Sequence, residues 1–159
     1  MTEPNQTIQK VKGKNFLAIH FGPWHTLSEY SIKHPDLDEA YPGKIFLRDL
    51  LGLSGSQISL NQFPPGAVMP FSHRHQVNEE VYVFIKGKGQ FYIDGEIIPV
   101  EEGTVIRVGP EGIRNWRNDS NEPLYYVVIQ TKQGSLTQET VNDGKRSFDP
   151  ITWPERPRS

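Results

Sequence analysis

The segment that decides the fold runs from residue 64 to residue 87 and reads PPGAVMPFSHRHQVNEEVYVFIKG. His73 and His75 stand two positions apart, and side chains two residues apart on an extended strand point to the same face. After a short break, Glu79 and Glu80 open the next apolar run. If the two segments lie side by side, one carboxylate converges with both imidazoles. Two histidines and one carboxylate with open coordination positions are typical of non-haem iron, and nickel, manganese, cobalt and zinc can use the same set.

Short runs of β-branched and aromatic residues continue through residues 41–131. Turns separate them, and they cover residues 57–63, 80–86, 90–93, 96–100, 104–108 and 124–131. Between two of these runs stands Asp94-Gly95, a pair typical of a type I′ hairpin because both central residues need positive φ. Runs this short, about ten residues apart, predict an antiparallel sandwich or barrel. Residues 47–53 could form a short helical turn.

Composition narrows the classes of protein. The chain has 159 residues, with 17 basic and 19 acidic side chains and no cysteine. A formal net charge of −2 argues against nucleic acid or an anionic membrane as a partner. The lack of cysteine excludes disulfides, zinc–thiolate sites and cysteine nucleophiles. No apolar stretch of about 18 residues and no signal-peptide pattern is present, so we expect a cytoplasmic protein.

The chain divides into three predicted zones: an N-terminal extension at residues 1–40, a β domain at residues 41–131 and a polar tail at residues 132–159. The extension contains one short apolar run, residues 16–21. The tail is rich in proline and should be extended.

Residues 64–87 resemble the first motif of the cupin superfamily, in which His-x-His is followed by a glutamate and, six residues further on, by a glycine. Six residues separate Glu80 from Gly87, so the resemblance favours Glu80 over Glu79 as the third ligand. It implies that His73, His75 and Glu80 bind a divalent transition metal, which could be Fe, Mn, Ni, Co or Zn.

Residues 103–118, GTVIRVGPEGIRNWRN, look like the second cupin motif, which ends in a fourth histidine ligand and an asparagine. Here the position of that histidine falls on Arg114 or Asn115, depending on the direction of counting. No histidine follows His75. The resemblance covers residues 56–131 and implies an all-β fold, the cupin double-stranded β-helix or jelly-roll barrel of a small single-domain cupin.

The same resemblance implies a small-molecule ligand in the barrel. Tyr82 and Phe84 share strand parity with Glu80, so they should face the interior. We assign them to the substrate pocket together with Arg114, Asn115 and Trp116. The activities of related families imply a metal-dependent dioxygenase, decarboxylase or isomerase, with catalytic residues unknown.

Two alternatives stay open. The first is a metal-free cupin that acts as a sugar epimerase or isomerase, with His73 or His75 as general base. The second is a non-catalytic small-molecule binding module. In either case the two histidines and Glu80 would hydrogen-bond one another or a bound molecule.

Two further expectations concern the region before the barrel. His20, His25 and His34 are expected to be surface or packing residues, with His20 or His25 reaching the metal site as the alternative. Cupins usually form dimers, so we expect a homodimer. The apolar run at residues 16–21 is our candidate for pairing with a partner subunit, because open sheets have edge strands that need cover.

Overall fold

The computed structural model describes residues 8–33, 40–138 and 140–155. Its largest sheet has five strands in the order β10-β7-β12-β6-β5, which are Val105–Val108, Asn78–Lys86, Leu124–Lys132, Gln57–Phe63 and Lys44–Phe46. A three-stranded sheet has the order β11-β8-β9, which are Arg114–Arg117, Lys88–Ile93 and Glu96–Glu101. All the pairings in both sheets are antiparallel. The all-β fold predicted from the sequence is therefore confirmed.

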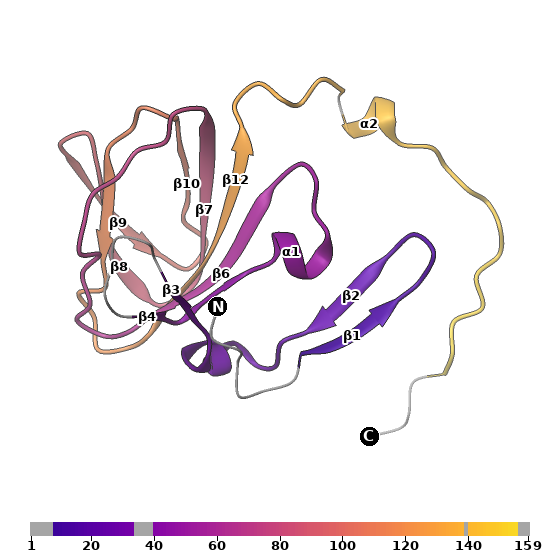
Figure 1. The fold of residues 1–159 in the computed structure, drawn as a ribbon, viewed down its shortest axis with the longest axis horizontal. Coiled ribbons are helices and arrows are strands. Elements are labelled where there is room, and N and C mark those ends of the chain that lie inside the picture. Colours follow the sequence, from indigo (N-terminus) through magenta and orange to yellow (C-terminus); the bar gives the residue numbers. More distant parts are fainter. Residues whose placement is uncertain (1–7, 34–39, 139, 156–159) are drawn as a thin grey trace.

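The remaining elements are short. They are the β1–β2 hairpin of Gln9–Lys12 and Leu17–His20, the β3–β4 pair of Ser31–Lys33 and Ala40–Pro42, the 3-10 helix η1 at Trp24–Glu29, and the helices α1 at Arg48–Leu51 and α2 at Thr140–Asp143. Figure 1 shows the two larger sheets gathered in one half of the molecule, with the β1–β2 hairpin and the C-terminal segment in the other half. Within the described residues, no helix has the length and apolar character that crossing a bilayer requires.

The main core lies between the two larger sheets. On β7, Glu80, Tyr82 and Phe84 are buried at alternating positions, as period-two strand geometry requires. They meet an aromatic and aliphatic cluster whose buried members are Phe63, Met69, Tyr82, Phe84, Phe91, Val100, Val108, Trp116, Leu124, Tyr126 and Val128. The predicted inward orientation of Tyr82 and Phe84 is confirmed.

A second core covers the outer face of the five-stranded sheet. Leu27 and Tyr30 from the N-terminal region pack with Ile45, Leu60 and Tyr125 from the sheet. Strand β12 is therefore buried on both faces over part of its length, which explains why its sequence, LYYVVIQT, is almost continuously apolar.

The hairpin turn and the helical turn predicted from the local sequence are both confirmed. Asp94 and Gly95 have φ values of 48° and 99° and join β8 to β9. The expected helical turn is α1, and it ends at Gly52 in the left-handed conformation.

The N-terminal apolar run forms strand β2, which pairs along one edge with β1 of the same chain, with Leu17 opposite Lys12 and His20 opposite Gln9. Among the described residues no strand pairs with its other edge. Pairing of this run with a partner subunit, and the homodimer, stay predictions.

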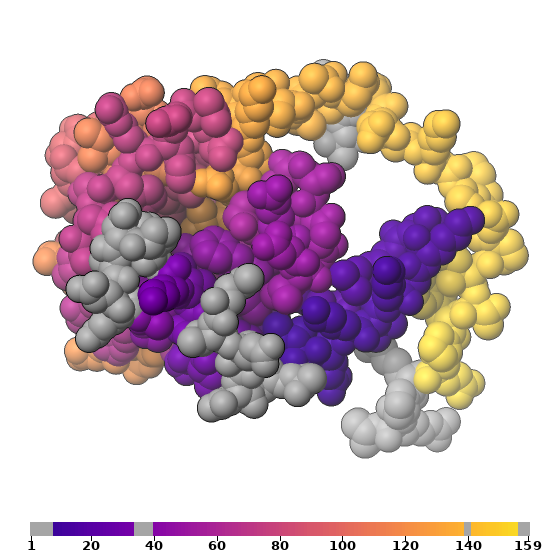
Figure 2. Space-filling model, viewed as in Figure 1, coloured from indigo at the N-terminus to yellow at the C-terminus, as the bar shows by residue number. Residues whose placement is uncertain are grey.

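Beyond β12, residues 133–138 and 141–155 of the tail are exposed, and the described part of the tail contains the short helix α2 and no further strand. Figure 2 shows it arching away from the packed strands.

Gly87 and Gly95 provide a matched test of the packing between strands. Both have positive φ, at 92° and 99°. A Cβ on Gly87 would lie 2.5 Å from the carbonyl oxygen of Pro123, whereas a Cβ on Gly95 would have no neighbour within 4 Å. We expect Gly95→Ala to lower the free energy of unfolding by about 1 kcal/mol, from backbone conformation alone. Gly87→Ala should cost about 3 kcal/mol because of the added clash. Urea denaturation of the two variants would measure the difference, and equal losses would contradict this packing.

Candidate functional site

The segment that contains the two histidines is held by the three-stranded sheet. The backbone N–H of His73 donates to the carbonyl of Arg114 at 3.1 Å, and the N–H of Arg114 donates back to His73 at 3.0 Å. The N–H of His75 donates to the carbonyl of Pro110 at 2.9 Å. From the sequence we considered the case in which this segment lies beside β7, and the structure pairs it with Arg114 of β11 instead. The histidines come from the side of β11, and Glu80 comes from β7 in the other sheet.

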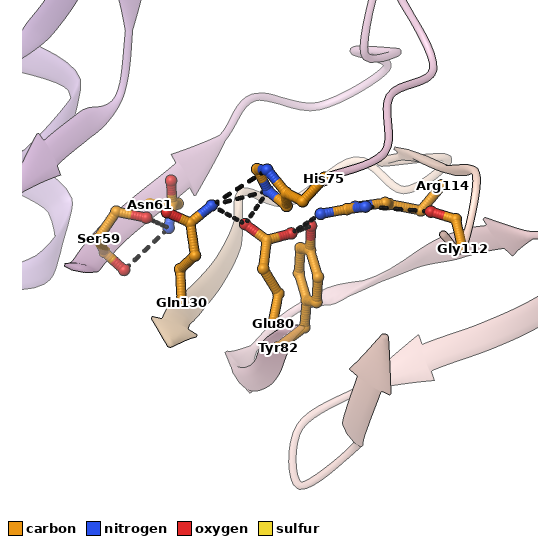
Figure 3. A network of polar contacts seen from close by, with 8 residues as sticks. All are labelled: Ser59, Asn61, His75, Glu80, Tyr82, Gly112, Arg114 and Gln130. Atoms are coloured by element: carbon orange, nitrogen blue, oxygen red, sulfur yellow. Dashed lines mark hydrogen bonds and ion pairs between the residues drawn. The ribbon is translucent and has the colours of Figure 1, made fainter. Parts of the chain in front are cut away.

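The three predicted ligands nevertheless come together. One donor atom from each of His73, His75 and Glu80 lies within 4.8 Å of the other two. The closest contact is 3.1 Å, between Nε2 of His75 and Oε1 of Glu80. Figure 3 shows His75 and Glu80 pointing toward one another.

The two carboxylate oxygens of Glu80 have different surroundings, and the side chain is only 8% exposed. Its Oε2 accepts hydrogen bonds from Nη2 of Arg114 at 2.5 Å and from the hydroxyl of Tyr82 at 2.6 Å. Its Oε1 lies against His75 and accepts a long hydrogen bond, 3.4 Å, from Nε2 of Gln130. Oε2 is thus engaged, and Oε1 is the oxygen that can bind something else (Figure 3).

These contacts keep Glu80 ionised. Burial raises the pKa of its carboxyl group, but the hydrogen bond from Tyr82 and the charge of Arg114 outweigh that effect and lower the pKa below its usual value. The pKa of the Tyr82 hydroxyl is raised by burial and by the neighbouring carboxylate. Tyr82 therefore remains protonated and donates to Glu80.

His73 is held neutral. Burial, followed by the charge of Arg114, lowers its pKa to about 4. Its Nδ1 atom is buried and has no hydrogen-bond partner among the described residues. Neutral imidazole is the form that coordinates metal. Two imidazoles, one of them with an unpartnered buried nitrogen, and a carboxylate oxygen fit a divalent transition metal by donor type.

Arg114 is one of the two residues, with Asn115, on which the histidine position of the second cupin motif falls. The side chain is fully buried, and besides Glu80 it contacts the carbonyl of Gly112, to which Nη1 donates at 3.0 Å. Its role in the structure is to pair with Glu80.

A cavity of about 480 Å³ opens over this group. Its lining includes His73, His75 and Glu80, and also Tyr82 and Trp116 from the predicted pocket. The other lining residues are Ile32, Tyr41, Lys44, Phe46, Gln57, Asn61, Met69, Phe71, Arg74, Tyr126, Val128 and Gln130. The volume suits a small organic molecule.

Three predicted pocket residues do not line this cavity. Phe84 lies deeper in the core, at 1% exposure. Arg114 lies behind Glu80. Asn115 points to the opposite side of β11, because neighbouring residues of a strand alternate, and it donates to the carbonyl of Met69 at 3.1 Å.

Other histidines lie away from the cavity. His20 and His25 are exposed, and Nδ1 of His20 accepts a hydrogen bond from the N–H of Gly22 at 3.2 Å. The expectation that they are surface residues is confirmed, and neither replaces a ligand. His34 lies outside the described residues.

Two of the cavity residues that the sequence analysis missed, Gln130 and Lys44, bear directly on the chemistry of the site. Nε2 of Gln130 lies 2.7 Å from Nε2 of His75. Gln130 shares strand parity with Tyr126 and Val128, so alternation along residues 124–131 could have found it. Lys44 lies on the short edge strand β5, far from either motif, and no local signal marked it.

Comparison with known proteins gives the class of protein. The family model of the cupin domain matches residues 59–130. A cupin protein from Bacteroides fragilis is 37% identical, with a TM-score of 0.64, over 74% of this chain and 98% of its own. The chain belongs to the cupin family.

Two other similar proteins are more distant. A proposed sugar phosphate isomerase from Acidithiobacillus ferrooxidans is 27% identical with a TM-score of 0.52, over 56% of this chain and 58% of its own. An uncharacterized protein from Methanocaldococcus jannaschii is 33% identical over 52 residues, which are 33% of this chain. The match spans only 42% of the length of that curated relative.

The lowered pKa of His73 predicts a pH dependence of stability. Because the unfolded chain takes up a proton near pH 6.5 and the folded chain only near pH 4, acidification favours unfolding across that window. In chelator-treated protein, the free energy of unfolding should fall more in the native chain than in His73→Gln as the pH drops from 6.5 to 4, by about 1–2 kcal/mol because the ring is partly exposed to solvent. Denaturation at several pH values would measure this. Parallel curves for the two proteins between pH 6.5 and 4.5, above the range where Glu80 titrates, would contradict it.

Proposed function

We propose that this chain is a small-molecule cupin whose cavity binds a divalent transition metal through His73, His75 and Glu80. The observation that carries the proposal is the convergence of these three donors within 4.8 Å at a cavity of about 480 Å³. The ion would act as a Lewis acid and leave open positions for a substrate. We propose an enzymatic role of the dioxygenase, decarboxylase or isomerase type.

The residues around the ligands have distinct tasks in this proposal. Arg114 and Tyr82 hold Oε2 of Glu80, so that the carboxylate presents only Oε1 to the cavity. Gln130 lies beside both His75 and Glu80, where its amide can orient a bound molecule. Trp116 and Phe71 contribute aromatic wall that excludes water from the ligand.

Among the three reaction classes, isomerisation is supported by the likeness to the Acidithiobacillus protein. That support comes from 27% identity over 58% of that protein. The other cupin structure, from Bacteroides fragilis, supports the family and not a reaction.

A second candidate function has its own supporting observation. The Arg114–Glu80 ion pair neutralises the one carboxylate of the predicted metal site. A metal-free cupin fits that arrangement, with His75 as a general base for a sugar isomerase or epimerase, or with the same side chains as a binding site only. Metal content separates the two candidates.

The metal proposal predicts one divalent ion per chain in protein purified without chelator or histidine tag. The double variant His73→Ala/His75→Ala should lose the ion while keeping its far-ultraviolet circular dichroism, because it loses two of three ligands and no core side chain. Elemental analysis by mass spectrometry is the measurement. Stoichiometric metal in the double variant would contradict the assignment. No ion in the native protein, and none bound on addition of Fe²⁺, Mn²⁺, Ni²⁺, Co²⁺ or Zn²⁺, would favour the metal-free candidate.

The two neighbouring glutamates provide a matched control. Glu80→Gln should weaken metal binding at least tenfold, because it removes the only carboxylate ligand of the set. Glu79→Gln should change it little, because Glu79 accepts hydrogen bonds from Arg107 outside the cavity, at 2.8 Å from Nε. Metal titration would compare the variants, and the reverse ranking would assign the wrong glutamate.

A further inference from the structure

Lys44 places a positive charge in the cavity from β5, the edge strand of the sheet that carries Glu80 on β7. Lys44 lies opposite Asn61 of β6, and both residues line the cavity. Its ammonium lies 4.9 Å from the ring centroid of Phe46, two residues along on the same face. The side chain is half-buried.

The charge of Lys44 lacks a carboxylate partner within the described part of the chain. The other two cationic side chains near the cavity are paired, Arg114 with Glu80 at 2.5 Å and Arg74 with Glu111 at 3.1 Å. Lys44 has no such ion pair among the described residues. Burying a cation without a partner is unfavourable, and a bound anion removes that cost.

The pKa of Lys44 agrees with a cation that is partly removed from water. Burial lowers the pKa of Lys44 to about 8, and the more distant charge of Glu80 offsets only part of the effect. At neutral pH the amine is still mainly protonated, so it can bind an anion as an ammonium group.

The charges at the cavity do not cancel. The Arg114–Glu80 and Arg74–Glu111 pairs contribute no net charge, and Lys44 leaves one positive charge in excess. A divalent ion at the predicted metal site would add two more. The cavity therefore favours an anion whether or not a metal is bound, and more strongly when it is.

We propose that the cavity takes a small organic anion and that Lys44 binds its carboxylate or phosphate group. The inference rests on the proposed function in that it places the ligand in the same cavity. The organic part of the ligand would lie against Met69, Trp116 and Val128, which supply apolar wall. Gln130 and Asn61 supply polar groups beside it.

Matched pairs of charged and neutral probes test whether the cavity prefers an anion, and they distinguish a carboxylate ligand from a phosphate ligand. Benzoate is compared with benzamide, and glucose 6-phosphate with glucose, by isothermal titration calorimetry at pH 7. We expect at least one anion to bind at least tenfold more tightly than its neutral analogue. Preference for benzoate alone would indicate a carboxylate ligand, and preference for glucose 6-phosphate alone a phosphate. If neither anion exceeds its neutral analogue, the inference is wrong.

Three variants test whether Lys44 is the residue that causes the preference for an anion. Lys44→Met removes the charge and keeps the length of the stem, and it should reduce the preference for the anion to less than threefold. Lys44→Arg keeps a cation and should retain it, and so should Lys86→Met, which makes the same exchange at an exposed lysine of β7. Because Lys44→Met removes a poorly compensated buried charge, its melting temperature should equal or exceed that of the native chain. An undiminished preference in a folded Lys44→Met would overturn the inference.

The metal proposal and the anion proposal can fail separately. The probe titrations are repeated on chelator-treated protein and on the His73→Ala/His75→Ala variant. An anion preference that persists there and is lost in Lys44→Met supports the role of Lys44 even if the chain never binds metal. A preference that vanishes without metal and survives in Lys44→Met would overturn the role of Lys44 and support the metal.

Discussion

The buried ion pair between Arg114 and Glu80 is the interaction on which the site depends. Arg114 is fully buried on β11 and Glu80 is 6% exposed on β7, so the pair joins the two larger sheets across the core. The backbone of Arg114 also bonds that of His73 in both directions. One residue therefore sets the positions of a histidine and a glutamate at once. Removing either charge would leave the other buried without a partner, which typically costs about 3–5 kcal/mol.

The same pair shapes the electrostatics of the cavity. Arg114 compensates the charge of Glu80 and helps to keep its carboxyl group ionised. Because Arg114 binds Oε2, only Oε1 of Glu80 faces the histidines. Arg114 also helps to keep His73 neutral, since the guanidinium opposes a second positive charge nearby. The cost is that Glu80 compensates the charge of Lys44 only in part. The excess positive charge of Lys44 follows from that, and it links the position of one arginine to the chemistry of the ligand.

Much of the fold could be predicted from local patterns. Alternation along residues 80–86 placed Glu80, Tyr82 and Phe84 on one face, and the Asp94-Gly95 pair located the hairpin. These features depend on strand parity and on backbone conformation, which neighbouring residues determine. The pairing of the His73–His75 segment could not be predicted, because nothing in its sequence shows which sheet it joins.

Sequence by itself determined that His73 and His75 share a face, because side chains two residues apart on an extended segment point the same way. The resemblance of the sequence to the cupin motifs selected Glu80 and the family of folds. Tertiary structure alone decided what surrounds these three residues. Gln130 reaches the site because β12 pairs with β7 in a register that places it opposite Glu80. Arg114 lies 34 residues beyond Glu80 and meets it across the core, while Lys44 enters from an edge strand with no motif. Register and sheet packing are set by the burial of the whole core, and no local pattern contains them.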